Sequence, residues 1–437
     1  MKKRRIAAML ALACICSTVM GTGCTSENGG NKRFSAEYGK TVPKSYTVSG
    51  HEESEEELVD QSAENIRKFA VESSAKIFPK VEGNYLYSPA SLYMGLQLCG
   101  SITAENSAED LMGLLGVKDR EELRLSGNAL IRDLTSDQKG EILKISNSVW
   151  MDTALLPEIS EAGQEVISQS AKALGADVYH EPLMDSATQK KIDSWISDRT
   201  DKMIRKMPVK PDSSTAMILF NTLYFNKDWK RKNDSDDIQD ADFWIDDNNS
   251  VDMTWIRYDK KNYPYVKTDH ATASAAAYAD DSYVIFIKPD YEQSLETVMS
   301  EDLKDVIDAY ANDRFTEPEG NVKVLFGIPM IDYEVKVDFL RDTIEEMGVS
   351  SVMAGGAFSD IDPDLFVSQI AQDCRIIMDQ EGTKAAAVTE FIMTKGASVE
   401  EDEKIVDLCL NREYAYVIMS KDDIPLFIGA VRDPRKG

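Results

Sequence analysis

Residues 379–404 read Asp-Gln-Glu-Gly-Thr-Lys-Ala-Ala-Ala-Val-Thr-Glu-Phe-Ile-Met-Thr-Lys-Gly-Ala-Ser-Val-Glu-Glu-Asp-Glu-Lys. They connect two strand-like runs, Ile376–Met378 and Ile405–Leu410, and a connection this long with few turn residues is uncommon and often functional. Because side chains alternate between the two faces of a strand, one face would carry small and uncharged residues and the other the charges. We interpret the stretch as a loop with the pattern of a buried strand, against the alternative of an Ala-rich helical turn or a flexible linker.

The rest of the chain predicts helices early and strands late. Helical spacing over Ile66–Ile77 ends at Pro79, Ser88-Pro89 is a typical helix start, and an apolar stripe from Ile192 to Met203 marks another helix. Without regular alternation of strands and helices, the pattern favours an α+β fold with largely antiparallel sheets. The other strand-like runs are Ile142–Trp150, Met217–Phe225, Val284–Ile287, Val322–Phe326, Tyr416–Met419 and Leu426–Val431, the last two forming a hairpin across a polar turn.

Composition excludes several classes of function. The chain has 437 residues, with 49 Lys and Arg against 76 Asp and Glu, for a net charge of −27. Such a chain lacks the basic face that nucleic-acid binding requires. Its three histidines, His51, His180 and His270, leave little for a multi-histidine metal site, and we expect neither metal nor cofactor. No phosphate-binding loop, dinucleotide fingerprint or nucleophile-elbow motif is present. Length alone suggests two or three domains.

The N-terminus reads as a targeting segment. Four basic residues precede a short apolar run, and small residues then lead to Cys24. Residues 1–23 are interpreted as a bacterial lipoprotein signal, with Cys24 lipidated, and the alternative is an ordinary cleaved signal with an incidental cysteine. Residues 24–56 would form a flexible acidic linker that lifts the following domain off the membrane. We expect the remaining three cysteines to be buried thiols.

Several motifs in order along the chain resemble the serpin family. The segment 381–387 is similar to the family's hinge, with the small residues typical of inhibitory members. Trp229, eight residues after Asn221, resembles a family tryptophan at the top of the central sheet. Further resemblances lie at Asn84–Leu92, Phe220–Phe225, Pro329–Ile331, Phe358–Ile361 and Pro425–Pro434.

The resemblance implies one serpin domain over residues 57–437, in place of the two or three domains suggested by length. It implies three β-sheets, eight or nine helices and an exposed reactive loop. The implied function is suicide inhibition of a serine peptidase, or of a cysteine peptidase, which attacks the loop and forms an acyl-enzyme. The cleaved loop then inserts into the central sheet and traps the peptidase in a covalent complex.

Roles for individual residues follow from the same resemblance. The hinge comprises Glu381, Gly382, Thr383, Ala385, Ala386 and Ala387. Residues expected to govern the opening of the sheet are Ser88, Ser91, Asn221, Gln372 and Trp229. Gln372 stands where the family often has histidine, and Val388 replaces a customary alanine on the outward face.

The reactive loop is longer than usual, so two positions for the scissile bond remain open. Counting from the hinge places the bond at Gly396–Ala397, with Met393, Lys395 and Ser398 as alternative reactive residues. Counting back from Asn411-Arg412 places it near Asp402–Glu403. About 15 residues at ~3.3 Å each would span the sheet, which favours the first count.

Small residues at 396–398 suit elastase-like or subtilisin-like peptidases, whereas Lys395 would suit a trypsin-like pocket. A non-inhibitory serpin acting as a surface binding or structural protein is the alternative function. It would carry bulky or charged inward residues, against which Thr383, Ala385 and Ala387 argue. A surface hydrolase or solute-binding lipoprotein is a third alternative. We expect an extracellular monomer that meets the membrane only through its lipid anchor.

Overall fold

The computed structural model describes residue 46 and residues 53–135, 142–207, 210–261, 263–312, 315, 322–383 and 404–436. Helix α1 (Glu55–Ile77) opens the continuous part. It begins with a capping box, in which Ser54 Oγ accepts from the Glu57 amide at 3.2 Å and Glu57 Oε2 accepts from the Ser54 amide at 2.8 Å. The helix therefore starts at Glu55, one residue before the expected end of the linker at residue 56.

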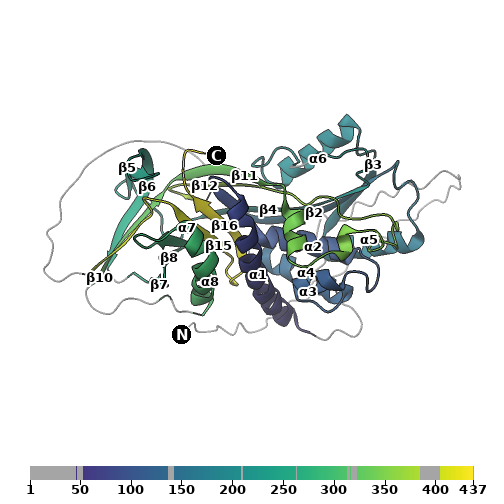
Figure 1. Ribbon diagram of the computed structural model, residues 1–437, viewed down its shortest axis with the longest axis horizontal. Coiled ribbons are helices and arrows are strands. Elements are labelled where there is room, and N and C mark those ends of the chain that lie inside the picture. Colours follow the sequence, from purple (N-terminus) through teal and green to yellow (C-terminus); the bar gives the residue numbers. More distant parts are fainter. Residues whose placement is uncertain are drawn as a thin grey trace, which may run out of the picture. The chain divides into compact units, whose positions relative to one another are not determined.

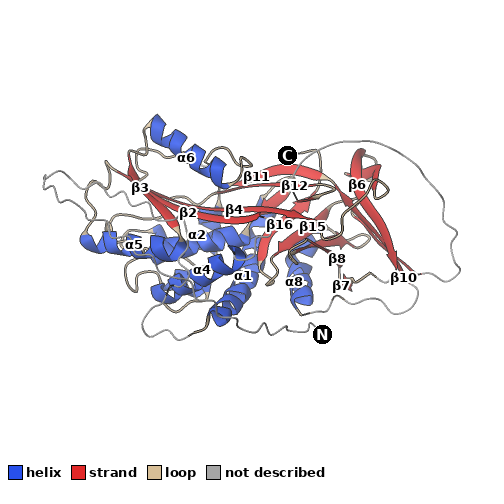
Figure 2. Ribbon diagram, turned by 180° about the vertical axis from the view of Figure 1, so that it is seen from behind, coloured by secondary structure: helices blue, strands red, loops and turns tan. Residues whose placement is uncertain are grey.

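The helices of the described residues pack mainly around the central sheet. Helices α2, α4 and α5 contact one face of its strands, and α6 covers the other face (Figures 1 and 2). Within the described ranges no helix is both long and apolar enough to span a bilayer. The bounds of the helices after α1 are α2 (Pro89–Ser101), α3 (Glu109–Leu115), α4 (Arg120–Thr135), α5 (Glu161–Leu174), α6 (Ser186–Arg199), α7 (Leu295–Thr297), α8 (Leu303–Ala311) and α9 (Leu340–Glu346).

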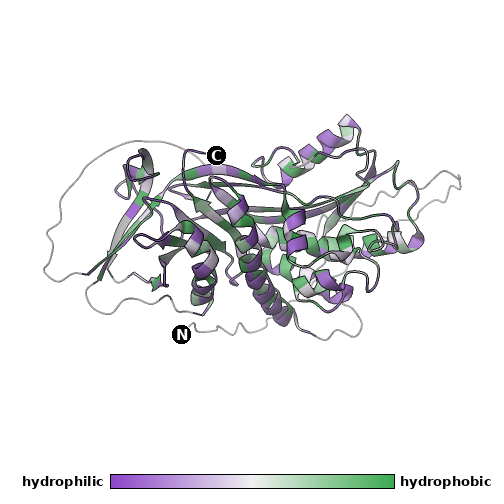
Figure 3. Cartoon of the chain, in the orientation of Figure 1, coloured by the Kyte–Doolittle hydropathy of each residue, from purple (hydrophilic) through white to green (hydrophobic). Residues whose placement is uncertain are grey.

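Local signals set the helix starts as expected. The Ser88 hydroxyl accepts from the Ser91 amide at 3.2 Å, and Pro89 occupies the first turn of α2. The predicted apolar spacing of α1 is buried, and its hydrophobic and hydrophilic residues alternate around the helix (Figure 3). The stripe of α6 was expected to reach Met203, but the helix ends at Arg199. Asp201 and Lys202 both take positive φ, which interrupts the helix.

Tyr46 of the predicted linker contacts the folded domain. Tyr46 is half-buried, and its hydroxyl hydrogen-bonds to Arg124 of α4, whose side chain is fully buried. Burial raises the pKa of the Tyr46 phenol, and the Arg124 charge opposes that rise. The segment expected to be a flexible acidic linker therefore contacts the domain at this residue.

Two sheets lie beyond the central one. A six-stranded antiparallel sheet has the order β1 (Tyr85–Tyr87), β16 (Pro425–Val431), β15 (Tyr414–Met419), β9 (Tyr283–Pro289), β8 (Ala271–Ala277) and β7 (Val266–Lys267). A four-stranded sheet has the order β14 (Lys404–Cys409), β10 (Val322–Pro329), β6 (Ser250–Lys261) and β5 (Ile238–Trp244).

The described strands of the central sheet form two hydrogen-bonded groups. Four strands have the order β13 (Gly382–Thr383), β4 (Met217–Asp228), β2 (Ile142–Asp152) and β3 (Ala176–Glu181), and two more pair as β11 (Ile331–Val337) with β12 (Gln372–Met378). In the described part of the chain no ladder joins β4 to β12. Three sheets were expected, and the described strands form four hydrogen-bonded groups because the central sheet is open between these two strands.

The strands predicted from the sequence are present, and most pairings are antiparallel as expected; β2 with β3 and β10 with β14 run parallel. The predicted C-terminal hairpin is confirmed, since β15 pairs with β16. At its centre the ring of Tyr416 lies against Gly429, where an added Cβ would come within 2.1 Å of the ring. The Tyr416 hydroxyl bonds to that of Tyr333 at 2.7 Å, and Tyr333 donates to the Tyr85 carbonyl at 2.9 Å.

We predict that Gly429→Ala lowers the free energy of unfolding by about 3 kcal/mol, because the buried Tyr416 ring has no room to move aside. Urea unfolding measures the effect. Gly113→Ala in α3 is the matched control: its Cβ would meet nothing within 4 Å, and alanine favours the helix. Equal midpoints for the two variants would contradict the packing argument.

Candidate functional site

The hinge residues lie at one end of the opening between β4 and β12. Gly382 pairs with Asp228 and Thr383 with Lys227, both in antiparallel register with the end of β4. A Cβ on Gly382 would lie 2.0 Å from the Lys227 carbonyl oxygen, a backbone atom. Only glycine therefore allows the hinge to approach β4 this closely.

Trp229 holds the turn that leads into the hinge. Its amide donates to the Glu381 carbonyl and its indole Nε1 to the Asp379 carbonyl, each at 2.8 Å. The indole stacks on Tyr278, with ring centres 4.8 Å apart and planes at 7°. The Tyr278 hydroxyl in turn bonds to Thr383 Oγ1 at 2.7 Å. These contacts fix Thr383 with its side chain buried, the orientation expected for odd-numbered loop residues.

A buried ion pair lies at the end of β4, where that strand pairs with the hinge residues. Lys227 is 3% exposed, and its Nζ lies 2.7 Å from Asp280 Oδ2. Burial alone would raise the pKa of Asp280, but hydrogen bonds from Lys227 and Ser282 outweigh it and lower that pKa. The end of β4 is thereby tied to the loop after β8.

A second cluster lies farther along β4, beneath the opening. Ser91 Oγ of α2 donates to Asn221 Oδ1 at 2.7 Å, and Asn221 Nδ2 donates to Asn147 Oδ1 of β2 at 2.8 Å. Asn147 Nδ2 donates to the Leu174 carbonyl at the end of α5 at 2.8 Å. The chain of amides links α2, β4, β2 and α5.

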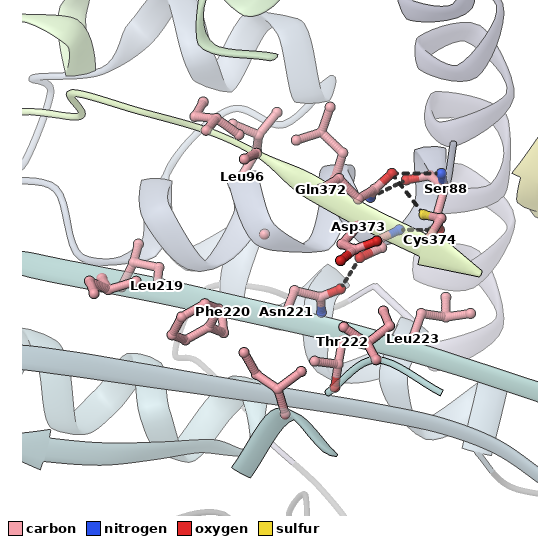
Figure 4. Close-up of a pocket in the computed structure, with 18 of the residues that line it drawn as sticks. Ser88, Leu96, Leu219, Phe220, Asn221, Thr222, Leu223, Gln372, Asp373 and Cys374 are labelled. Atoms are coloured by element: carbon pink, nitrogen blue, oxygen red, sulfur yellow. Dashed lines mark hydrogen bonds between the residues drawn. The ribbon is translucent and has the colours of Figure 1, made fainter. Parts of the chain in front are cut away.

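The start of α2 also hydrogen-bonds to β12, on the other side of the opening. Gln372 of β12 accepts from the Ser88 amide at 2.8 Å and donates to the Ser88 carbonyl at 3.0 Å (Figure 4). The Ser88 hydroxyl donates to the Leu426 carbonyl of β16 at 2.6 Å. Cys374 lies beside Gln372 and is buried, as predicted, and burial raises the pKa of its thiol.

The opening is a cavity of about 290 Å³. Its walls are β4 on one side and β12 with the preceding residues on the other, and α2 forms its floor. The lining is mostly apolar, with Leu96, Leu219 and Phe220 drawn in Figure 4. The strand edges that face this cavity are not joined to each other by backbone hydrogen bonds.

The structure thus gathers four of the five predicted sheet-opening residues around the first turn of α2: Ser88, Ser91, Asn221 and Gln372. Trp229 lies apart from them, with Glu381 and Gly382 at the end of the sheet. Outside the described residues lie Cys24, Ala385, Ala386, Ala387, Met393, Lys395, Gly396, Ala397 and Ser398.

Two contributors were missed from the sequence. Asn147 interrupts an apolar strand-like run between two serines, which is a signal that could have been used. Tyr278 follows the Ala-rich strand β8 and carries no local signal, because its role depends on stacking with Trp229.

The chain belongs to the serpin family. The family model described as serpin (serine protease inhibitor) matches residues 64–434. Serpin-ZX of Arabidopsis thaliana is 24% identical, over 86% of this chain and 97% of its own length. The serine protease inhibitor of Cyanea capillata is also 24% identical, over 83% and 95%. The solved native state of the thermophilic serpin Tengpin matches with a TM-score of 0.70 at 21% identity, over 88% and 96%. These relatives are named as inhibitors rather than enzymes.

We predict that Gly382→Ala releases the hinge from β4. The Trp229 amide, which donates to Glu381, should then exchange with solvent roughly tenfold faster. Native-state hydrogen exchange measures this, with Gly113→Ala as the control. An unchanged rate at Trp229 would contradict the close-approach argument.

We further predict that Asn221→Ala lowers the free energy of unfolding by about 2 kcal/mol, because Ser91 and Asn147 both lose their partner. A double-mutant cycle with Ser91→Ala should give a coupling of about 1 kcal/mol. Additive effects would show that the two side chains act independently.

Proposed function

We propose that this protein is a suicide inhibitor of serine peptidases. Family membership supports the class, and the open central sheet with hinge residues already paired at its end supports the mechanism. The observation that carries most weight is the pairing of Gly382 and Thr383 with β4, next to the cavity between β4 and β12.

In this mechanism the peptidase carries out the bond cleavage, and this chain supplies the loop insertion that traps the peptidase. The peptidase serine attacks the carbonyl of the scissile bond, forms an ester with it, and releases the downstream segment as a free amine. The loop on the acyl side then adds as a strand between β4 and β12. Serpin loop insertion is itself a standard example of strand addition, in which main-chain hydrogen bonds supply the affinity. Insertion carries the acyl-enzyme away before water can cleave the ester.

The register of the hinge supports a scissile bond within 393–398. If the pairing of Thr383 with Lys227 continues along β4, Ala387 meets Leu223 and Met393 meets Met217, the first residue of the strand. Met393 would then be the last loop residue that can pair with β4. A bond at Asp402–Glu403 would leave residues 394–402 unpaired, with slack that lets the peptidase escape undistorted.

The target class follows from the residues around that bond. Gly396, Ala397 and Ser398 suit the small pocket of elastase-like peptidases and subtilisin-like enzymes, and Lys395 suits a trypsin-like pocket with a buried acid. Lipidation of Cys24 would hold the inhibitor on the outer surface of a bacterial membrane through one acylated residue.

Mixing the purified protein with a neutrophil-type elastase, a subtilisin and a trypsin tests the proposal. We expect a band at the summed mass on denaturing gels, and the released peptide should begin between residues 394 and 398. A raised melting temperature after cleavage reports insertion. Cleavage without such a rise would remove the inhibitor mechanism and leave a non-inhibitory serpin.

We predict that Ala387→Glu abolishes the covalent complex but not cleavage, because the residue would enter the sheet facing the core. Val388→Glu is the matched control on the opposite face and should keep most of the trapping. The measured quantity is the fraction of cleaved inhibitor that retains peptidase. Equal losses in the two variants would contradict the assumed orientation of the inserted strand.

A further inference from the structure

A carboxyl group without a matching donor lines the cavity that would receive the inserted strand. Asp373 lies on β12, on the face opposite Gln372 and Cys374, and Figure 4 shows it between that strand and β4. Its Oδ1 is buried and finds no hydrogen-bond donor among the described residues. A buried carboxylate oxygen without a donor is costly, so its protonation state matters for the cavity.

The carboxyl group of Glu334 on β11 is the polar partner within hydrogen-bonding reach of Asp373. Two carboxyl groups can share a hydrogen bond only when one of them carries a proton. Burial, followed by the charge and hydrogen bond of Glu334, raises the pKa of Asp373 to about 6. Asp373 therefore gives up its proton near pH 6.

Nearby cations are engaged with other carboxylates. Lys336 lies opposite Asp373 in the β11–β12 register, and its Nζ is 3.6 Å from Asp338. Arg375 makes two hydrogen bonds to Asp332, at 3.0 and 3.1 Å. Among the described residues lining the cavity, the charged ones are Lys210, Asp373 and Arg375; α2 and the cavity-lining part of β4 contribute none.

We propose that protonation of Asp373 controls the insertion of the loop strand, so that trapping is more efficient in mildly acidic than in neutral solution. The inference rests on the proposed function and adds a regulatory residue to it. A new strand beside β12 would cover the open side of Asp373 and remove its remaining water. The ionised group would then lie against Glu334 with less water to compensate it, and Lys336, opposite it on β11, would be the nearby charge that partly offsets the cost.

The direction of the pH effect follows from this desolvation. Covering Asp373 raises its pKa above the value of about 6 that it has beside the open cavity. The inserted state therefore binds more protons, and insertion is favoured below pH 6. That advantage is lost as pH rises through the pKa of the inserted state. A further rise of one pKa unit would make insertion about tenfold less favourable above both values.

The test compares the full-length protein with Asp373→Asn at pH 5.5 and at pH 7.5, using whichever peptidase is trapped. The measured quantity is the fraction of cleaved inhibitor that retains peptidase, and the ratio of the two proteins at one pH cancels the pH dependence of the peptidase. We expect a ratio near one at pH 5.5, and roughly threefold or more in favour of Asp373→Asn at pH 7.5. Glu334→Gln, which removes the like charge, should shift in the same direction.

Asp252→Asn, at an exposed carboxylate of β6 in another sheet, is the control and should match the wild type at both pH values. A ratio that does not change with pH would overturn the proposal while leaving the inhibitor mechanism intact. Absence of insertion at every pH, in every variant, would overturn the proposed function and this inference with it.

The number of protons taken up on cleavage provides a second measurement, which would not change if Asp373 had only a structural role. Cleavage is carried out at pH 6.5 in weak buffer with an indicator dye, so that hydrolysis of the peptide bond contributes equally to wild type and variant. We expect the wild type to take up more protons than Asp373→Asn, by up to about one per chain. Equal uptake would overturn the proposal.

Discussion

The structure depends on two central strands, β4 and β12, that flank one cavity without pairing with each other. Between the hinge pairing and the far end of the cavity, neither facing edge has a ladder partner among the described residues, and such an edge is ordinarily a liability in a folded protein. A strand placed between them would satisfy both edges at once. The hinge residues Gly382 and Thr383 already begin such a strand at one end, held by Trp229 and Tyr278. The remaining features of the site either hold this opening in place or respond to its filling.

The first turn of α2 is the anchor shared by both sides of the opening. Ser91 binds Asn221 of β4, while the backbone of Ser88 binds Gln372 of β12 and its hydroxyl binds the Leu426 carbonyl. Because one helix end contacts both strands, any movement that widens the opening must break or exchange these bonds. Gln372 forms both of its bonds without titrating, whereas burial and the neighbouring Glu334 raise the pKa of Asp373, one residue further on, to about 6.

Local sequence signals predicted the helices and strands that local interactions determine. They failed where tertiary packing overrides the intrinsic secondary-structure propensity of the residues. The Ser88 cap, the spacing of α1 and the C-terminal hairpin were read correctly. Strand β8 was missed because its seven residues, Ala271–Ala277, include five alanines, which are poor strand formers; neighbouring strands on both sides impose the conformation. Strand β11 was missed although Ile331–Val337 alternates well, so that signal was present and unused.

The sequence by itself determined the family, the α+β class and the alternation that gives Thr383 an inward face, because motif order and side-chain period are written along the chain. Through the resemblance to the serpin family, the sequence also identified Ser88, Ser91, Asn221 and Gln372 as candidate sheet-opening residues. Only the tertiary structure decided that Gly382 must lack a side chain, since the obstacle is the Lys227 carbonyl, 155 residues away. It alone placed Glu334 beside Asp373 and showed that, among the described residues, β4 and β12 do not pair with each other. Such facts depend on distances between strands remote in sequence, which no local pattern encodes.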